Sequence, residues 1–176
     1  MKKNRNSKSF SIWLVPDNYC FDITSSYIKL LSEKYGGPLI TPHVTLVSGF
    51  LGDKIELIKK IDEISNMLKP FDIFFKSIGH KDEFFRSLYL IVSEDKNFKK
   101  SRNIALKELG IGRENDFIPH LSLVYGNFEE KKKKSMINLI SKIPKMFKAE
   151  QIYLAYNDEI NLKWSVVEKF NLNTNI

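Results

Sequence analysis

One pattern occurs twice in the chain, as Pro42-His43-Val44-Thr45-Leu46 and as Pro119-His120-Leu121-Ser122-Leu123. These two copies hold two of the three histidines in the chain. Side chains at positions i and i+2 of a β-strand point to the same face. Each copy therefore predicts a strand that presents an imidazole and a hydroxyl together, with its apolar residues on the opposite, buried face.

Strand-like and helix-like segments alternate on both sides of the two copies. Helices are predicted at residues 22–35, 54–68, 97–109 and 129–143, where apolar residues recur at helical spacing. Strands are predicted at residues 10–15, 43–50, 71–78, 87–93, 120–125, 149–156 and 163–172, where β-branched and aromatic residues gather. The pattern predicts one α+β domain of two similar lobes over residues 10–176, preceded by a basic mobile tail at residues 1–9.

The composition limits the class of protein. The chain has 176 residues, a formal charge of +7 and 43% hydrophobic residues, which is typical of one folded domain. No apolar run approaches the roughly 20 residues of a membrane-spanning helix. The lone Cys20, expected to be buried, favours a reducing, cytoplasmic setting. The basic charge favours a negatively charged partner, with solubility alone as the alternative.

Two imidazoles and two hydroxyls facing one cleft suit a phosphodiester substrate. A neutral histidine can take a proton from attacking water, and a protonated one can give a proton to the leaving oxygen. The hydroxyls of Thr45 and Ser122 can hold the non-bridging oxygens. This chemistry needs no metal and no other cofactor. The alternative is that both histidines are structural residues of the core.

The chain resembles the 2H phosphoesterase superfamily, which is named for two His-x-(Thr/Ser) motifs, and within it the plant and yeast cyclic phosphodiesterase branch. The resemblance covers residues 10–172. Besides the two histidine motifs, it rests on Ser11-Ile12-Trp13-Leu14-Val15-Pro16, Tyr35-Gly36-Gly37-Pro38, Phe84-Phe85-Arg86-Ser87-Leu88-Tyr89-Leu90 and the continuation Val124-Tyr125-Gly126.

The resemblance implies a bilobal, pseudo-symmetric fold, with antiparallel sheets facing a central cleft and helices outside. It implies an enzyme that hydrolyses ADP-ribose 1″,2″-cyclic phosphate, a by-product of tRNA splicing, or opens nucleoside 2′,3′-cyclic phosphates to 2′-phosphates. The catalytic set carried over is His43, Thr45, His120 and Ser122. Which histidine is base and which is acid stays open.

Weaker predictions concern the residues that bind substrate. Tyr125 matches the family's tyrosine after the second motif. Trp13, Phe84, Phe85 and Arg86 are the other candidates, each with a structural alternative: core packing for the aromatic residues and a surface salt bridge for the arginine. His80 is interpreted as an ordinary loop histidine, and the run Lys131–Lys134 as a solvated helix face rather than a phosphate-binding patch.

Three other functions compete with a small-molecule cyclic phosphodiesterase. The first is an enzyme of RNA metabolism that acts on RNA ends, like a 2′-5′ ligase or a 3′-end nuclease. The second is hydrolysis of cyclic dinucleotides. The third is a non-catalytic RNA-binding module, which two intact His-x-(Thr/Ser) pairs disfavour. The expected protein is a cytoplasmic monomer without a membrane partner.

Overall fold

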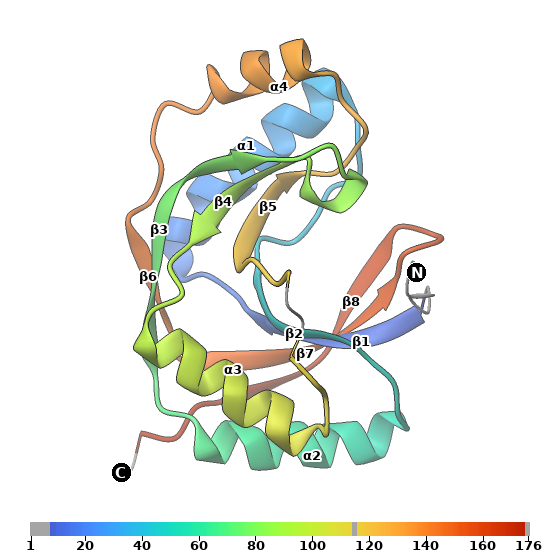
Figure 1. The fold of residues 1–176 in the computed structure, drawn as a ribbon, viewed down its shortest axis with the longest axis vertical. Coiled ribbons are helices and arrows are strands. Elements are labelled where there is room, and N and C mark those ends of the chain that lie inside the picture. The colour runs from blue at the N-terminus through green and yellow to red at the C-terminus, as the bar shows by residue number, and fades with distance from the viewer. Residues whose placement is uncertain (1–7, 114–115, 175–176) are drawn as a thin grey trace.

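The computed structural model describes residues 8–113 and 116–174, and an antiparallel sheet forms its centre. In these ranges the sheet has eight strands in the order β6-β3-β4-β5-β2-β1-β7-β8, and it curls into a half-barrel (Figure 1). The strands are β1 Lys8–Leu14, β2 Val44–Phe50, β3 Phe71–His80, β4 Leu88–Val92, β5 His120–Val124, β6 Met146–Ala149, β7 Gln151–Asp158 and β8 Lys163–Asn171.

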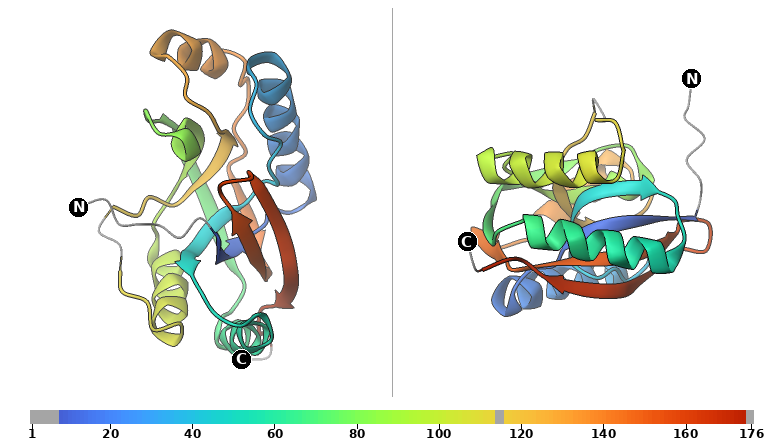
Figure 2. Two further views of the ribbon diagram at one scale, coloured as in Figure 1. Left: turned by 90° about the vertical axis from the view of Figure 1, so that its right-hand side faces the viewer. Right: turned by 90° about the horizontal axis from the view of Figure 1, so that it is seen from below.

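Helices lie outside the sheet and cover its two ends. They are α1 Asn18–Tyr35, α2 Lys54–Met67, α3 Lys96–Glu108 and α4 Glu130–Ile137, with a short 3₁₀ turn, η1, at Phe84–Arg86. Helices α1 and α4 lie at one end, and α2 and α3 lie at the other (Figures 1 and 2). The predicted α+β architecture is therefore confirmed.

Strands β5 and β2 join the two halves of the sheet. Val44 pairs with Leu121 in antiparallel register, and both side chains are completely buried. The first half contains β6, β3, β4 and β5, and the second contains β2, β1, β7 and β8. The two histidine strands are thus neighbours in one curved sheet. Its curvature, rather than separate opposing walls, brings their polar faces toward one space.

Several boundaries differ from the prediction. Strand β1 begins at Lys8, so Lys8 and Ser9 are not part of a tail, and residues 1–7 lie outside the described ranges. Helix α1 begins four residues early, because Asp17 caps it by accepting a hydrogen bond from the backbone N–H of Cys20. Helix α4 already ends at Ile137, and strand β6 was not predicted.

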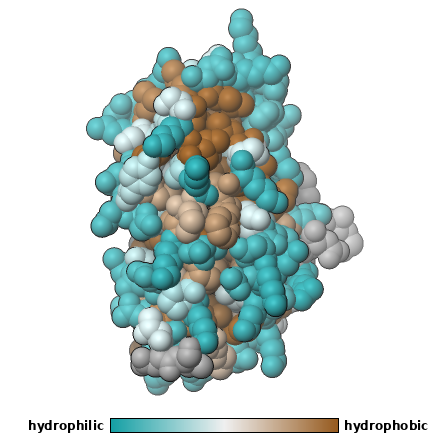
Figure 3. All heavy atoms as spheres, turned by 90° about the vertical axis from the view of Figure 1, so that its left-hand side faces the viewer, coloured by the Kyte–Doolittle hydropathy of each residue, from teal (hydrophilic) through white to brown (hydrophobic). Residues whose placement is uncertain are grey.

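The outer edge of the first half carries some exposed apolar surface. Phe74 of β3 pairs with Met146 of β6, and both side chains are exposed. Figure 3, which looks at this side of the molecule, shows hydrophobic side chains surrounded by hydrophilic ones. Within the described part of the chain, none of the helices has the combined length and hydropathy to cross a membrane.

Candidate active site

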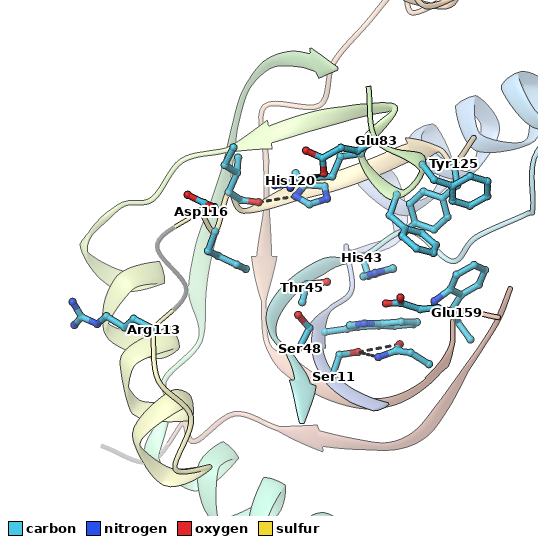
Figure 4. Close-up of a pocket in the computed structure, with 18 residues that line it drawn as sticks. Ser11, His43, Thr45, Ser48, Glu83, Arg113, Asp116, His120, Tyr125 and Glu159 are labelled. Atoms are coloured by element: carbon cyan, nitrogen blue, oxygen red, sulfur yellow. Dashed lines mark hydrogen bonds and ion pairs between the residues drawn. The ribbon is translucent and has the colours of Figure 1, made fainter. Parts of the chain in front are cut away.

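A cavity of about 790 Å³ opens on the concave side of the sheet, at the junction of β5 and β2. His43, Thr45 and His120 line it, and Figure 4 shows the two imidazoles pointing into the same space. Other predicted residues that line the cavity are Trp13, Phe84, Phe85, Arg86 and Tyr125. The structure therefore brings together all but one of the residues selected from sequence.

The pairing of Val44 with Leu121 explains this convergence. In an antiparallel ladder, this pair sets position 43 beside 122 and position 45 beside 120. Because Val44 and Leu121 point into the core, their sequence neighbours must point to the opposite face. The two sequence motifs thus form one compact set of side chains.

Both imidazoles are oriented by the same backbone contact. Nδ1 of His43 lies 2.7 Å from the carbonyl oxygen of Thr41, and Nδ1 of His120 lies 2.6 Å from that of Ile118. A carbonyl can only accept, so each Nδ1 carries the proton and donates it. In the neutral ring this leaves Nε2 as the free acceptor. Each carbonyl oxygen belongs to the residue before the proline of its motif. The same hydrogen bond therefore orients the histidine in both motifs.

His43 lies in an environment that disfavours its charged form. Trp13 stacks on its ring, with centroids 3.8 Å apart and planes 13° apart. Burial lowers the pKa of His43 to about 4, helped by the nearby charge of His120 and opposed by the hydrogen bond to Thr41. In the free protein His43 is therefore neutral above mildly acidic pH.

His120 has a more mixed environment. Burial lowers its pKa, the hydrogen bond to Ile118 raises it, and the positive charge of Arg86 lowers it. The carboxylate of Glu83 raises the same pKa. Tyr89 packs against the ring with a centroid distance of 4.9 Å. The pKa of His120 thus lies below its ordinary value overall, and the carboxylate of Glu83 limits the fall.

Ser122 is the predicted residue that the cavity lining does not include. It is 6% exposed, and its hydroxyl donates to the carbonyl oxygen of Phe85 at 3.4 Å. A second hydrogen bond, to Tyr125, acts to lower the pKa of that phenol, although burial raises this pKa to about 12. In the free protein Ser122 therefore ties Phe85 and Tyr125 to β5.

Aromatic rings form one side of the cavity. Phe85 contacts Tyr125 edge to face at 5.3 Å, and Tyr125 lies 5.5 Å from Trp164. Phe84 contacts Phe85 at 5.0 Å. Gly37 allows Tyr125 this position, because its φ is +109° and a Cβ there would lie 2.5 Å from the Tyr125 carbonyl oxygen. These rings offer flat apolar surface beside the two histidines.

Several cavity residues were not predicted from sequence. Ser11 could have been found, because it lies two positions before Trp13 on β1 and must share its face. Ser11 exchanges hydrogen bonds with Asn157, at 3.2 and 3.0 Å. Trp164 comes from β8, and no local pattern marked it. The remaining lining residues are Ser48, Glu83, Arg113, Asp116, Phe117, Ile118 and Glu159.

Two of the charged residues that line the cavity, Glu83 and Arg86, are paired with each other. Arg86 donates to Glu83 through Nη2 at 2.6 Å and Nε at 2.7 Å, as the salt-bridge alternative expected. His80 ends β3, with its Nδ1 3.7 Å from Glu130. Among residues 8–113 and 116–174, no group of three or more His, Cys, Asp or Glu side chains is placed to hold a metal ion.

Comparison with known proteins places the chain in a family. A cyclic phosphodiesterase from Arabidopsis thaliana is 24% identical over 127 residues, which cover 72% of this chain and 70% of the plant protein. The fold matches Escherichia coli LigT complexed with 3′-AMP, with a TM-score of 0.60, 13% identity and coverage of 96% of this chain and 100% of LigT. The protein TT0787 of Thermus thermophilus gives the same four values.

A family model described as "Cyclic phosphodiesterase-like protein" matches residues 8–174, which is nearly the whole chain. This match includes both histidine motifs and every strand of the sheet. The chain belongs to the cyclic phosphodiesterase-like family of 2H phosphoesterases, and it is a phosphodiesterase.

Proposed function

We propose that this protein hydrolyses a cyclic phosphodiester on a ribose, either ADP-ribose 1″,2″-cyclic phosphate or nucleoside 2′,3′-cyclic phosphates, the latter to 2′-phosphates. The observation that carries the proposal is the matched orientation of His43 and His120 in one cavity. Each ring donates through Nδ1 to the carbonyl two residues earlier, which leaves Nε2 of the neutral ring available for proton transfer.

The proposed reaction needs one neutral and one protonated histidine. Water attacks phosphorus while the neutral imidazole accepts its proton, and the P–O bond to the leaving ribose oxygen breaks as the other imidazole gives up a proton. The low pKa of His43 favours it as the base. Burial and Arg86 lower the pKa of His120, and the carboxylate of Glu83 partly offsets this lowering, which leaves His120 as the better candidate for the acid.

The hydroxyls complete the proposed site by binding the phosphate. Thr45 lines the cavity, and the register at Val44 sets it beside His120. Ser122 donates over a long 3.4 Å distance to the Phe85 carbonyl, and a phosphate oxygen is a stronger acceptor than a carbonyl. We therefore assign both hydroxyls to the non-bridging oxygens, where negative charge develops in the transition state.

The aromatic side of the cavity supports a nucleotide as the substrate. Phe84, Phe85, Tyr125 and Trp164 offer ring faces on which a base can stack. LigT, which has the same fold, was crystallised with 3′-AMP. A base stacked on this side would leave the ribose phosphate between the two histidines.

A substrate panel tests this function. The rate constant kcat/KM is compared for ADP-ribose 1″,2″-cyclic phosphate, 2′,3′-cyclic mononucleotides, RNA ending in a cyclic phosphate, and cyclic dinucleotides. We expect the first two classes to be preferred, with a 2′-phosphate as the product from cyclic mononucleotides. Preference for RNA ends or cyclic dinucleotides would contradict the proposal. Turnover no higher than that of the double variant His43→Ala/His120→Ala would indicate a binding module.

A further inference from the structure

The four residues of the segment 83–86 form one edge of the cavity, and we call them the cavity lip. All four side chains line the cavity: Glu83, Phe84, Phe85 and Arg86. The segment lies between β3 and β4 and contains the 3₁₀ turn η1, so it has no strand partner of its own. What holds this segment in place therefore decides the position of two aromatic rings, those of Phe84 and Phe85.

The inner side of the lip is attached to the end of β5. The backbone N–H of Gly126 donates to the carbonyl oxygen of Phe84 at 2.9 Å, and Ser122 donates to that of Phe85. The N–H of Lys81, just before the lip, donates to the carbonyl oxygen of Arg86 at 3.0 Å. These contacts fix the backbone of the lip close to the catalytic strand.

The segment just before the lip, residues 81 and 82, is attached to α4 by Lys133. This residue stands in a run of four lysines, and its three neighbours are exposed while its own side chain is 1% exposed. Its Nζ forms an ion pair with Asp82 and lies 3.5 Å from Glu130 and 3.4 Å from the carbonyl oxygen of Lys81. The prediction of a solvated helix face is thus correct for three of the four lysines and wrong for Lys133.

A buried ammonium group is costly unless it is paired and hydrogen-bonded. Lys133 meets this requirement with three oxygen partners, and two of them belong to the segment just before the lip. His80, at the start of the same segment, lies 3.7 Å from Glu130 of α4. The contacts between α4 and residues 80–82 therefore set where the chain enters the lip.

We propose that Lys133 is a positioning residue for substrate binding. By holding residues 81 and 82 against α4, it places the rings of Phe84 and Phe85 where the base of a nucleotide can stack on them. This inference rests on the proposed function for its choice of substrate. Lys133 touches no reacting atom, so it should affect affinity for the base and leave the chemistry at His43 and His120 unchanged.

The test compares Lys133→Met with Lys132→Met. Methionine fills similar space without the charge, and Lys132 is an exposed lysine of the same helix. The binding probe is adenosine 2′-monophosphate, followed by the fluorescence of Trp13 and Trp164, the two tryptophans of the chain, which both line the cavity. Kinetics are measured with adenosine 2′,3′-cyclic phosphate and with a ribose cyclic phosphate that lacks a base.

For Lys133→Met we expect the Kd for adenosine 2′-monophosphate and the KM for the adenosine cyclic phosphate each to rise about tenfold. A change of this size corresponds to the loss of stacking by one base. We expect kcat to stay within about twofold and the KM for the base-free substrate to stay unchanged, because both depend on His43 and His120, whose rings are held by backbone carbonyl groups outside the lip. Lys132→Met should match the wild type in every measurement.

The remaining outcomes separate this inference from the proposed function. An unchanged Kd in folded Lys133→Met, an equal loss for the base-free substrate, or no nucleotide binding by the wild type would each overturn the role of Lys133. Nucleotide binding that Lys133→Met weakens, without hydrolysis by the wild type, would overturn only the proposed function. If Lys133→Met does not fold, the same binding and kinetic measurements on Asp82→Ala test the role of Lys133. The Asp82 side chain is 91% exposed, and this variant removes the same ion pair.

Discussion

The indole of Trp13 lies face to face with the imidazole of His43, with ring centroids 3.8 Å apart. Trp13 is 2% exposed, so its ring shields one face of the imidazole from water. A charged imidazole loses hydration there, which is the largest cause of the lowered pKa of His43. The sequence predicts Trp13 as either a site residue or a core residue; in the structure its side chain is buried and also lines the cavity.

Replacing Trp13 by leucine should raise the pKa of His43 from about 4 toward the ordinary value near 6.5, because water regains access to the ring. The pKa is measured by NMR titration of the histidine ring protons. Trp13→Phe, which keeps an aromatic face, should give a smaller rise. A pKa that stays near 4 in a folded Trp13→Leu protein would show that burial by residues other than Trp13 lowers the pKa of His43.

The pH dependence of kcat/KM should be bell-shaped with its maximum on the acidic side of neutrality. This rate constant reports the free enzyme, in which the pKa of His43 is about 4 and that of His120 also lies below its ordinary value. The reactive form has His43 neutral and His120 protonated, so activity falls below about pH 4 and again as the pH rises through the pKa of His120. A maximum above pH 7 would contradict this assignment.

Removing either imidazole should lower kcat by roughly 10²–10⁴ or more, because each variant loses one proton-transfer partner. The double variant His43→Ala/His120→Ala should be much less than additively worse, since both groups act in one step. His80→Ala is the matched control for kcat alone, because His80 lies against Glu130 outside the cavity lining and takes no part in proton transfer. Near-normal turnover by either folded single variant would refute two-histidine catalysis.

Much of the fold follows from local patterns, and the errors have physical causes. The buried face of α1 consists of Cys20, Thr24, Ile28 and Leu31. A count of apolar residues misses Thr24, which is buried because its hydroxyl donates to the carbonyl of Cys20 at 2.7 Å. The cap at Asp17, which apolar spacing does not mark, explains why the predicted start lies four residues too late.

The end of α4 shows that apolar spacing alone does not determine where a helix ends. Leu139, Ile140 and Ile143 continue a helix-like spacing beyond Ile137, yet they pack against the core from the connection to β6. Strand β6 is only four residues long and gains its hydrogen bonds from β3, a partner distant in sequence. Short edge strands of this kind depend on tertiary pairing more than on local preference.

The candidate site was predictable where the chain repeats itself. The two motifs gave His43, Thr45 and His120 directly, since strand alternation fixes the face of each residue. Trp164 could not be found, because its place beside Tyr125 depends on the pairing of β7 with β8. The burial of Lys133 and its contacts could not be predicted either, since a run of lysines does not indicate which of its members becomes buried.

The hydroxyl pair gives a graded prediction. Thr45→Val and Ser122→Ala should each reduce kcat less than the histidine variants do, by up to about 10²–10³, through a lost hydrogen bond to the phosphate. Thr45→Ser should leave kcat nearly unchanged because it keeps the hydroxyl. A large loss in Thr45→Ser would show that packing of the methyl group matters instead.

Chelation tests whether the two imidazoles act without a metal. A histidine whose Nδ1 donates to a carbonyl is also well oriented to bind a metal through Nε2, so the orientation of His43 and His120 suits either use. Phosphodiesterases that use metals gather several carboxylates and histidines around paired ions. Here the proposed base and acid are the two rings themselves, so no further ligand is required. We expect kcat and KM to be unchanged after dialysis against EDTA. Loss of activity in EDTA, restored by Mg²⁺, Mn²⁺ or Zn²⁺, would replace the two-histidine mechanism with metal-assisted hydrolysis.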